Sequence, residues 1–150
     1  MNSTIETFGY PHTLIYEGQC WVVLLRPKQA TLGALVLACK EEALAMSAIS
    51  DAARAEMATL MCRCEALLRA AFNFDKINYL MLMMVDPHVH YHVLPRYSTT
   101  QSCTLPALAR VEFADAGWPA LPRLNLGAET TPEQNAALVA MLREQWTALS

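Results

Sequence analysis

The sequence predicts an α+β fold in one domain, with strands and helices in separate stretches of the chain. Three observations indicate it. Short β-like runs lie near the N-terminus, one long stretch with helical periodicity follows, and two further β-like runs come after that stretch. A chain of 150 residues, of which 54% are apolar, is long enough to bury one core. We therefore expect a single domain over residues 1–150.

The first part of the chain predicts a β-hairpin and a third strand. Residues 13–17 and 20–26 are rich in β-branched and aromatic side chains, and Gly18 and Gln19 between them suit a tight turn. Pro27 ends the second run, because proline has no N–H to donate within a sheet. Residues 31–38, "TLGALVLA", predict the third strand.

The middle of the chain, residues 41–71, predicts a helix. Apolar residues recur there at three- and four-residue intervals and form one buried stripe. They are Met46, Ile49, Ala53, Met57, Leu60, Cys64, Leu67 and Leu68. Ser47 or Ser50 can cap an N-terminus inside this region, so a short turn followed by one long helix is an alternative.

Two more strands follow the helix. Residues 77–85, "INYLMLMMV", are apolar at odd and even positions alike, which predicts a strand buried on both faces with the methionines as core filler. Asp86 and Pro87 interrupt it, and a histidine-rich strand comes next.

The last third of the chain is less regular until its end. Residues 98–106 predict a loop, residues 110–115 an edge strand, and residues 117–125 a proline-rich coil. A capping box begins at Thr131, with proline at the first helical position, and predicts a C-terminal helical extension over residues 131–149.

The composition argues against several partners. A net charge of −3 leaves little material for a basic face, so we expect no nucleic acid. The longest apolar runs are too short to span a bilayer, so we expect no membrane. The first residues show no basic region followed by an apolar run, so no secretory signal is expected and the cytoplasm is the predicted location.

The cysteines predict no disulfide framework, because they are odd in number and irregularly spaced. They are Cys20, Cys39, Cys62, Cys64 and Cys103. Cys62 and Cys64 lie in the helical stretch, where residues two apart point to different sides, so they make a poor metal or redox pair. We expect buried free thiols in a reducing compartment.

The segment "HVHYHVLPRY", residues 88–97, carries three of the four histidines at alternate positions. In a strand such positions share one face, so His88, His90 and His92 should lie together, spaced by roughly 6–7 Å. Three charged imidazoles so close would repel one another, and the set should be mostly uncharged at neutral pH. A neutral imidazole can act as a nucleophile or a proton carrier, and it can bind a metal.

Three interpretations of this segment stay open on the residues alone. The histidines can be half-buried strand residues without further role. They can bind a metal, although a straight strand brings only two of them to one ion, and His12, Asp86 or a distant cysteine would have to complete the site. They can also perform covalent catalysis at phosphorus, in which one imidazole attacks and a neighbour contacts the phosphoryl or leaving-group oxygen.

The motif "HVHYHVLPR" resembles the signature of the histidine triad (HIT) superfamily, His-x-His-x-His followed by two apolar residues and often Pro-Arg. The order of elements is also similar over about residues 10–120, and "GWP" at Trp118 is similar to a C-terminal feature of some members. The resemblance implies a five-stranded antiparallel sheet with one long helix packed on it, usually as a homodimer. It implies a nucleotidyl hydrolase or transferase that needs no metal or other cofactor.

The resemblance also implies a role for each histidine of the motif. His90 would attack the α-phosphorus of a nucleoside phosphoramidate or a (di)nucleoside polyphosphate and form a covalent nucleotidyl-histidine, which water then releases. His92 would contact the phosphoryl or leaving-group oxygen. His88 would orient His90 through backbone hydrogen bonds. Asn78 matches an asparagine that many members carry at the start of the preceding strand.

Several family features are missing here. "LMMVDP" stands where most members have a polar Gly-Gln-Ser/Thr loop, Gly33-Ala34 stands for the usual Gly-His, and a leucine replaces the ribose-binding aspartate of the second strand. Arg96, Asp86 and Lys40 are the candidates to replace the lost substrate contacts. A nucleotide-binding module with weak or no turnover is therefore the alternative function. His12 is expected on the surface.

Overall fold

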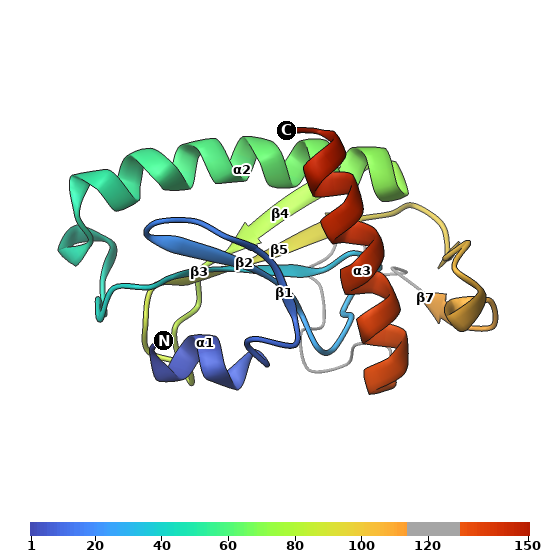
Figure 1. Ribbon diagram of the computed structural model, residues 1–150, viewed down its shortest axis with the longest axis horizontal. Coiled ribbons are helices and arrows are strands. Elements are labelled where there is room, and N and C mark those ends of the chain that lie inside the picture. Colours follow the sequence, from blue (N-terminus) through green and yellow to red (C-terminus); the bar gives the residue numbers. More distant parts are fainter. Residues whose placement is uncertain (114–129) are drawn as a thin grey trace.

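The computed structural model describes residues 1–113 and 130–150. In this part of the chain a five-stranded antiparallel sheet has the order β1-β2-β3-β5-β4 (Figure 1). Its strands are β1 (Leu14–Glu17), β2 (Trp21–Leu25), β3 (Leu35–Cys39), β4 (Lys76–Leu80) and β5 (His90–Arg96). The predicted α+β fold and its five-stranded antiparallel sheet are confirmed.

Helices lie on both sides of this sheet. Figure 1 shows the long helix α2 (Asp51–Phe72) along one face, the short N-terminal helix α1 (Ser3–Thr7) on the opposite side, and α3 (Pro132–Ala148) crossing near β1. Two single turns of 3-10 helix, Met46–Ala48 and Pro106–Leu108, lie in the connections. None of the described helices is long and apolar enough to cross a membrane.

Helix α2 begins later than residue 41, so the alternative of a short turn followed by one long helix is confirmed. Ser50 is the N-cap, and its hydroxyl accepts a hydrogen bond from the Ala53 N–H. The Glu41 carboxylate in turn accepts from the backbone N–H and the hydroxyl of Ser50. The helix ends at Asn73, which adopts the left-handed conformation that stops helices.

The predicted third strand is also shorter than expected. It begins at Leu35, because residues 31–34 form a turn in which Gly33 has a φ of +87°. A Cβ at Gly33 would lie 2.6 Å from the Phe72 ring, so both the backbone angle and the packing require glycine there.

The prediction of a strand over 77–85, buried on both faces, is wrong. Strand β4 ends at Leu80 and forms the edge of the sheet, with its side chains only half buried. The chain then turns, with Met83 at a φ of +52°, and Met84 and Val85 are 87% and 90% exposed. Met84 is therefore not core filler. A run of apolar residues at odd and even positions does not distinguish a central strand from an edge strand, and it does not show where the strand ends.

Two smaller predictions also need correction. The predicted edge strand 110–115 is reduced to β7 (Glu112–Phe113), which pairs with β6 (Gln101–Ser102) in a separate hairpin instead of joining the main sheet. Residues 114 and 115, the coil 117–125 and the "GWP" segment lie outside the described residues. All five cysteines are free as predicted, but Cys62 is exposed and Cys20 only half buried.

The two faces of the sheet carry separate cores. Side chains of one parity, such as Trp21 and Leu37, pack against α2 and α3. Side chains of the other parity pack against α1 and the residue that follows it. This second core consists of Ile5, Phe8, Val22, Leu24, Val36 and Ala38. The second face is the one that holds the histidines.

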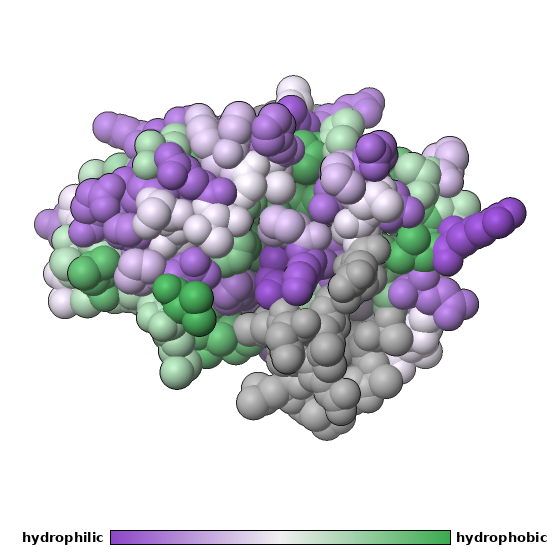
Figure 2. Space-filling view, turned by 90° about the horizontal axis from the view of Figure 1, so that it is seen from below, coloured by the Kyte–Doolittle hydropathy of each residue, from purple (hydrophilic) through white to green (hydrophobic). Residues whose placement is uncertain are grey.

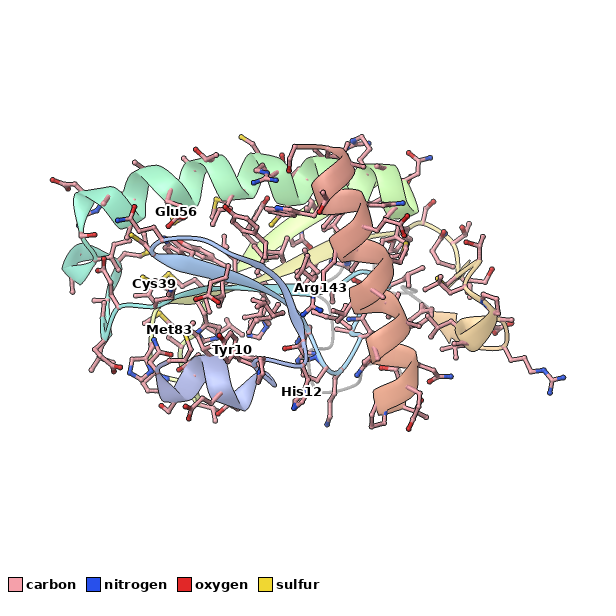
Figure 3. The ribbon with its side chains drawn as sticks, in the orientation of Figure 1. Tyr10, His12, Cys39, Glu56, Met83 and Arg143 are labelled. Atoms are coloured by element: carbon pink, nitrogen blue, oxygen red, sulfur yellow. The ribbon has the colours of Figure 1, made fainter. Side chains whose placement is uncertain are left out.

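Polar contacts tie the β1–β2 hairpin to the rest of the molecule. The Glu56 carboxylate on α2 accepts from the backbone N–H groups of Gln19 and Cys20 at 2.8 and 2.5 Å (Figure 3). Lys40 at the end of β3 pairs with Glu17 at 2.9 Å. These contacts hold the hairpin beneath the start of α2.

Candidate active site

The histidine strand has the alternation that its sequence predicts. His90 lies opposite Ala38 of β3 and His92 opposite Val36, so both imidazoles are on the face that carries the second core. Val89 and Val93, at the intervening positions, are buried in the core under α2. His88 precedes the first residue of β5, and its ring contacts α1 on the same side of the sheet.

The rings of His90 and His92 are neighbours. Their centroids lie 5.2 Å apart with the planes nearly perpendicular at 80°. The Nδ1 atom of His90 lies 2.7 Å from the backbone oxygen of His88. Because a carbonyl oxygen only accepts, Nδ1 must carry the hydrogen, and in a neutral ring Nε2 then holds the free lone pair. The Nε2 lone pair of a neutral His90 is therefore not used by this hydrogen bond.

His88 is fixed by three further contacts. Its Nδ1 lies 2.9 Å from the Thr4 hydroxyl oxygen, and its backbone N–H donates to that same oxygen at 3.2 Å. Its Nε2 lies 2.8 Å from a carboxylate oxygen of Glu42. The first histidine of the motif is thus held between α1 and the segment that follows β3.

Phe8 forms an aromatic wall against the other two histidines. Its ring centroid lies 5.4 Å from that of His90 and 5.6 Å from that of His92. All three histidines are buried, with 9% of His88, 2% of His90 and 7% of His92 exposed. This environment excludes most water and strengthens electrostatic interactions at the site.

Burial lowers the pKa of His92 to about 4, and the positive charge of Arg26 and the neighbouring His90 contribute to the same shift. His92 is therefore neutral at pH 7. Within the described residues its Nδ1 atom is buried and has no hydrogen-bond partner. An imidazole in this state has one N–H to offer and one lone pair, and a phosphoryl oxygen beside it could accept the N–H.

Arg26 is a residue of the site that the sequence did not reveal. It follows β2 at the position of the histidine face and is buried, and burial lowers the pKa of its guanidinium. One of its nitrogens donates to the Lys28 backbone oxygen at 2.5 Å. No spacing rule links this position to the motif, because the strand pairing of β2, β3 and β5 brings it near His92.

The predicted substrate ligands lie at different places. Arg96 donates to the Asn78 side-chain oxygen at 2.8 Å, and both lie on the histidine face, at the far end of β5 from His88. Asp86 is half buried in the β4–β5 connection. The Lys40 side chain is engaged with Glu17 and the Gly18 carbonyl at the hairpin. The structure therefore brings none of these four side chains into direct contact with His90 or His92 through a described interaction.

The metal interpretation finds no ligand set in residues 1–113 and 130–150. No group of three or more histidine, cysteine, aspartate or glutamate side chains is arranged there to hold an ion. His12, one of the three options for completing a metal site, is exposed, as expected of a surface histidine (Figure 3).

Thr4, Phe8 and Glu42 contact the histidines, and the sequence does not indicate these contacts either. Asn2 followed by Ile5 and Phe8 is a capping residue ahead of apolar residues three apart, and this was the available signal for α1. It predicts a helix but not where the helix packs. The contacts to His88 span 84 residues of chain, and no local pattern reports them.

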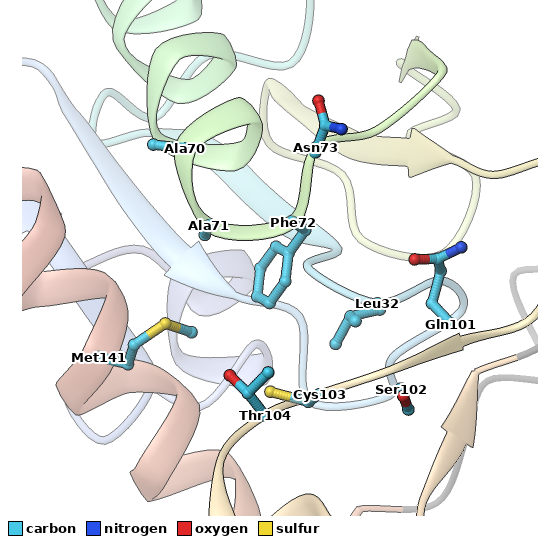
Figure 4. Close-up of a pocket in the computed structure, with 10 residues that line it drawn as sticks. All are labelled: Leu32, Ala70, Ala71, Phe72, Asn73, Gln101, Ser102, Cys103, Thr104 and Met141. Carbon is cyan, nitrogen blue, oxygen red and sulfur yellow. The ribbon is translucent and has the colours of Figure 1, made fainter.

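A cavity of about 230 Å³ lies elsewhere, between the C-terminal end of α2, the segment around β6, and α3 (Figure 4). Its walls are Leu32, Ala70, Ala71, Phe72, Asn73, Gln101, Ser102, Cys103, Thr104 and Met141. None of the three histidines lines it, so it is separate from the site on the other face of the sheet.

Known structures share this fold. A histidine triad protein from Bradyrhizobium japonicum superposes with a TM-score of 0.72 at 18% identity, covering 97% of this chain and 96% of that one. A histidine triad protein from Sinorhizobium meliloti 1021 gives the same TM-score and identity, with 97% and 95% covered. A hypothetical histidine triad nucleotide-binding protein from Sulfolobus tokodaii has a TM-score of 0.68 at 16% identity, with 97% and 91% covered.

A comparison with curated protein sequences finds no match. A comparison with protein-family models does find one, and it agrees with the structural similarity. The family model of the HIT domain matches residues 9–99, which is more than half of the chain and includes all of the motif and the sheet that carries it. The protein is a member of the histidine triad family.

Proposed function

We propose that this protein is a nucleotidyl hydrolase or transferase that works through a covalent intermediate on His90. The observation that carries the proposal is the hydrogen bond from His90 Nδ1 to the His88 carbonyl, which leaves the Nε2 lone pair free for attack. The substrate is a nucleoside phosphoramidate or a (di)nucleoside polyphosphate.

In the first step His90 Nε2 attacks the α-phosphorus. A nitrogen–phosphorus bond forms, the bond from phosphorus to the leaving group breaks, and the leaving group departs with the electron pair and takes up a proton. In the second step water attacks the same phosphorus, its proton is released, and the nitrogen–phosphorus bond breaks. The products are a nucleoside monophosphate and free His90. Transfer replaces hydrolysis when another nucleophile takes the place of water.

His92 and Arg26 would stabilise the negative charge of the phosphoryl group. A neutral His92, its pKa lowered to about 4, can donate its one N–H to a phosphoryl or leaving-group oxygen. The nearby guanidinium of Arg26 supplies the positive charge that the neutral His92 lacks. Arg96, Asn78 and Asp86 remain proposed substrate contacts farther along the same face or in the adjoining loop.

The second candidate function is a nucleotide-binding module with little or no turnover. It is favoured by the β4–β5 connection, where exposed Met84 and Val85 offer no side-chain donors to phosphate. Loss of such donors costs about 10²–10³-fold in rate each when they act on the transition state. Tight binding of AMP in calorimetry, without turnover of any substrate in a panel, would select this function over the first.

We further propose a cytoplasmic homodimer that forms at the β4 edge of the sheet. The edge strand is half buried and is followed by three exposed apolar side chains, Leu82, Met84 and Val85. On the face seen in Figure 2, apolar side chains gather toward the end of the molecule where α1 lies. A second copy would remove such groups from water.

The mechanism is tested with His90→Ala. Turnover of an adenosine phosphoramidate and of a dinucleoside polyphosphate should fall by about 10³-fold or more, because the nucleophile is lost. Mass spectrometry of the quenched wild type should find the nucleotidyl adduct on His90. His12→Ala is the matched control, since His12 is exposed and outside the site, and it should keep full activity. Full activity in His90→Ala with intact circular dichroism would refute the covalent mechanism.

A further inference from the structure

Five polar atoms, three of them nitrogens of His88, form the contacts around the first histidine of the motif. The Thr4 hydroxyl faces both the Nδ1 atom and the backbone N–H of His88, and the Glu42 carboxylate faces the Nε2 atom. Thr4 is 1% exposed and His88 9%, so the Thr4 contacts are shielded from water, whereas the Glu42 side chain is 74% exposed.

The donors and acceptors of this group allow one complete arrangement for a neutral ring. Glu42 only accepts, so Nε2 of His88 carries the hydrogen and Nδ1 holds a lone pair. Thr4 then accepts the backbone N–H of His88 and donates its own hydroxyl hydrogen to Nδ1. Every polar atom has a partner in this arrangement.

The segments that carry Thr4 and Glu42 are themselves fixed. The Asn2 side chain caps α1 through the Ile5 N–H and donates to the carbonyls of Cys39 and Glu41. The Val89 N–H donates to the Ala43 carbonyl at 2.9 Å, which holds the residues after β3 against the residue that follows His88. Both partners of His88 therefore approach it from anchored backbone.

We propose that Thr4 and Glu42 are positioning residues for the His90 nucleophile. They hold the His88 ring and backbone, and the His88 carbonyl holds His90 Nδ1 at 2.7 Å. This inference rests on the proposed function for its effect on rate, but the effect on the state of the imidazoles does not depend on turnover.

Substitutions of Thr4 and Glu42 should lower kcat by different amounts. Thr4→Val keeps the size of the side chain but leaves two groups of His88 without a partner in a buried place. It should lower kcat by about ten-fold with little change in KM, because a misaligned nucleophile affects the reaction step and no substrate contact is removed. Glu42→Ala should lower kcat by only about two- to three-fold, because its contact is largely exposed and water can replace the lost acceptor.

Conservative variants separate positioning from packing. Thr4→Ser restores the hydroxyl and should recover most of the rate lost in Thr4→Val. Glu42→Gln keeps an acceptor oxygen and should retain more activity than Glu42→Ala. Thr7→Val, on the exposed side of the same helix, and Glu144→Gln, on α3, are the matched controls and should leave kcat unchanged.

Long-range ¹H–¹⁵N correlation spectra of the imidazoles provide the readout that needs no substrate. In the wild type His88 should show a protonated Nε2 and His90 a protonated Nδ1, and in Thr4→Val one or both should change to mixed tautomers. Unchanged tautomers and unchanged kcat in Thr4→Val would overturn the inference while leaving the function intact. Changed tautomers in Thr4→Val, together with a wild type that turns over no substrate in the panel, would overturn the proposed function and keep the inference.

Discussion

The Nδ1 atom of His90 lies 2.7 Å from the backbone oxygen of His88, so the second histidine of the motif is oriented by the main chain of the first histidine. The acceptor of this hydrogen bond is present whatever side chain stands at position 88. The side chain of His88 serves a different purpose, since it ties that stretch of backbone to Thr4 and Glu42.

This division of roles predicts that His88→Ala is less damaging than His90→Ala. The carbonyl that accepts from His90 survives the substitution, and only the side-chain anchor is lost. We expect kcat to fall by about ten- to a hundred-fold in His88→Ala, compared with about 10³-fold or more in His90→Ala. Steady-state kinetics on one substrate measures both. Equal losses in the two variants would show that the His88 ring itself takes part in the reaction.

The lowered pKa of His92 predicts a loss of stability in acid. The unfolded chain binds a proton near pH 6.5 and the folded protein only near pH 4, so the unfolded state gains protons first as the pH falls between these values. The free energy of unfolding should drop by about 2–3 kcal/mol from pH 7 to pH 4.5 through this group. Urea denaturation at both pH values measures the drop. It should be smaller in His92→Gln, which cannot be protonated.

The same shift predicts how His92 responds to its neighbour. Arg26→Gln removes a positive charge and should raise the pKa of His92, but not to 6.5, because burial is the larger cause of the shift. Arg26→Lys keeps the charge and should raise it less. NMR titration of the His92 ring protons gives these values directly. A pKa that stays the same in Arg26→Gln would place the guanidinium too far away to act on the site.

The packing of α3 predicts a large effect at Trp146. Its ring stacks on Tyr16 with 4.8 Å between centroids, and the Arg63 guanidinium lies 4.1 Å above it. Trp146→Ala should lower the free energy of unfolding by about 3 kcal/mol or more, since it opens a cavity and loses the cation–π contact. Thermal and urea unfolding check this. Arg63→Ala should cost only about 0.5–1 kcal/mol.

The proposed dimer predicts that a charge at the edge weakens association. Leu82 and Leu149 are 50% and 51% exposed. Leu82 lies in the proposed contact surface, and Leu149, equally exposed at the end of α3, is its matched control. Leu82→Glu should shift the protein toward monomer in sedimentation velocity, because it places a carboxylate on the proposed contact surface. Leu149→Glu, at the end of α3, should not. A wild type that is monomeric at high concentration would rule out the dimer.

The sequence by itself determined the local elements and the composition of the histidine face. Alternation put His90 and His92 on one side of a strand, the apolar stripe identified α2, and the capping box identified the start of α3. These features could be read because each depends on residues a few positions apart. Where a segment met a turn or a sheet edge, as at Gly33 and after Leu80, the same patterns gave wrong bounds.

Only the tertiary structure decided which distant groups serve the histidines. The order of the strands placed Arg26 near His92, and the docking of α1 brought Thr4 and Phe8 to a motif more than 80 residues later in the chain. Periodicity reports how a segment is buried, but it carries no information on which other segment covers it. That choice depends on the packing of the whole sheet and its two cores, and this packing determines the environment of His90.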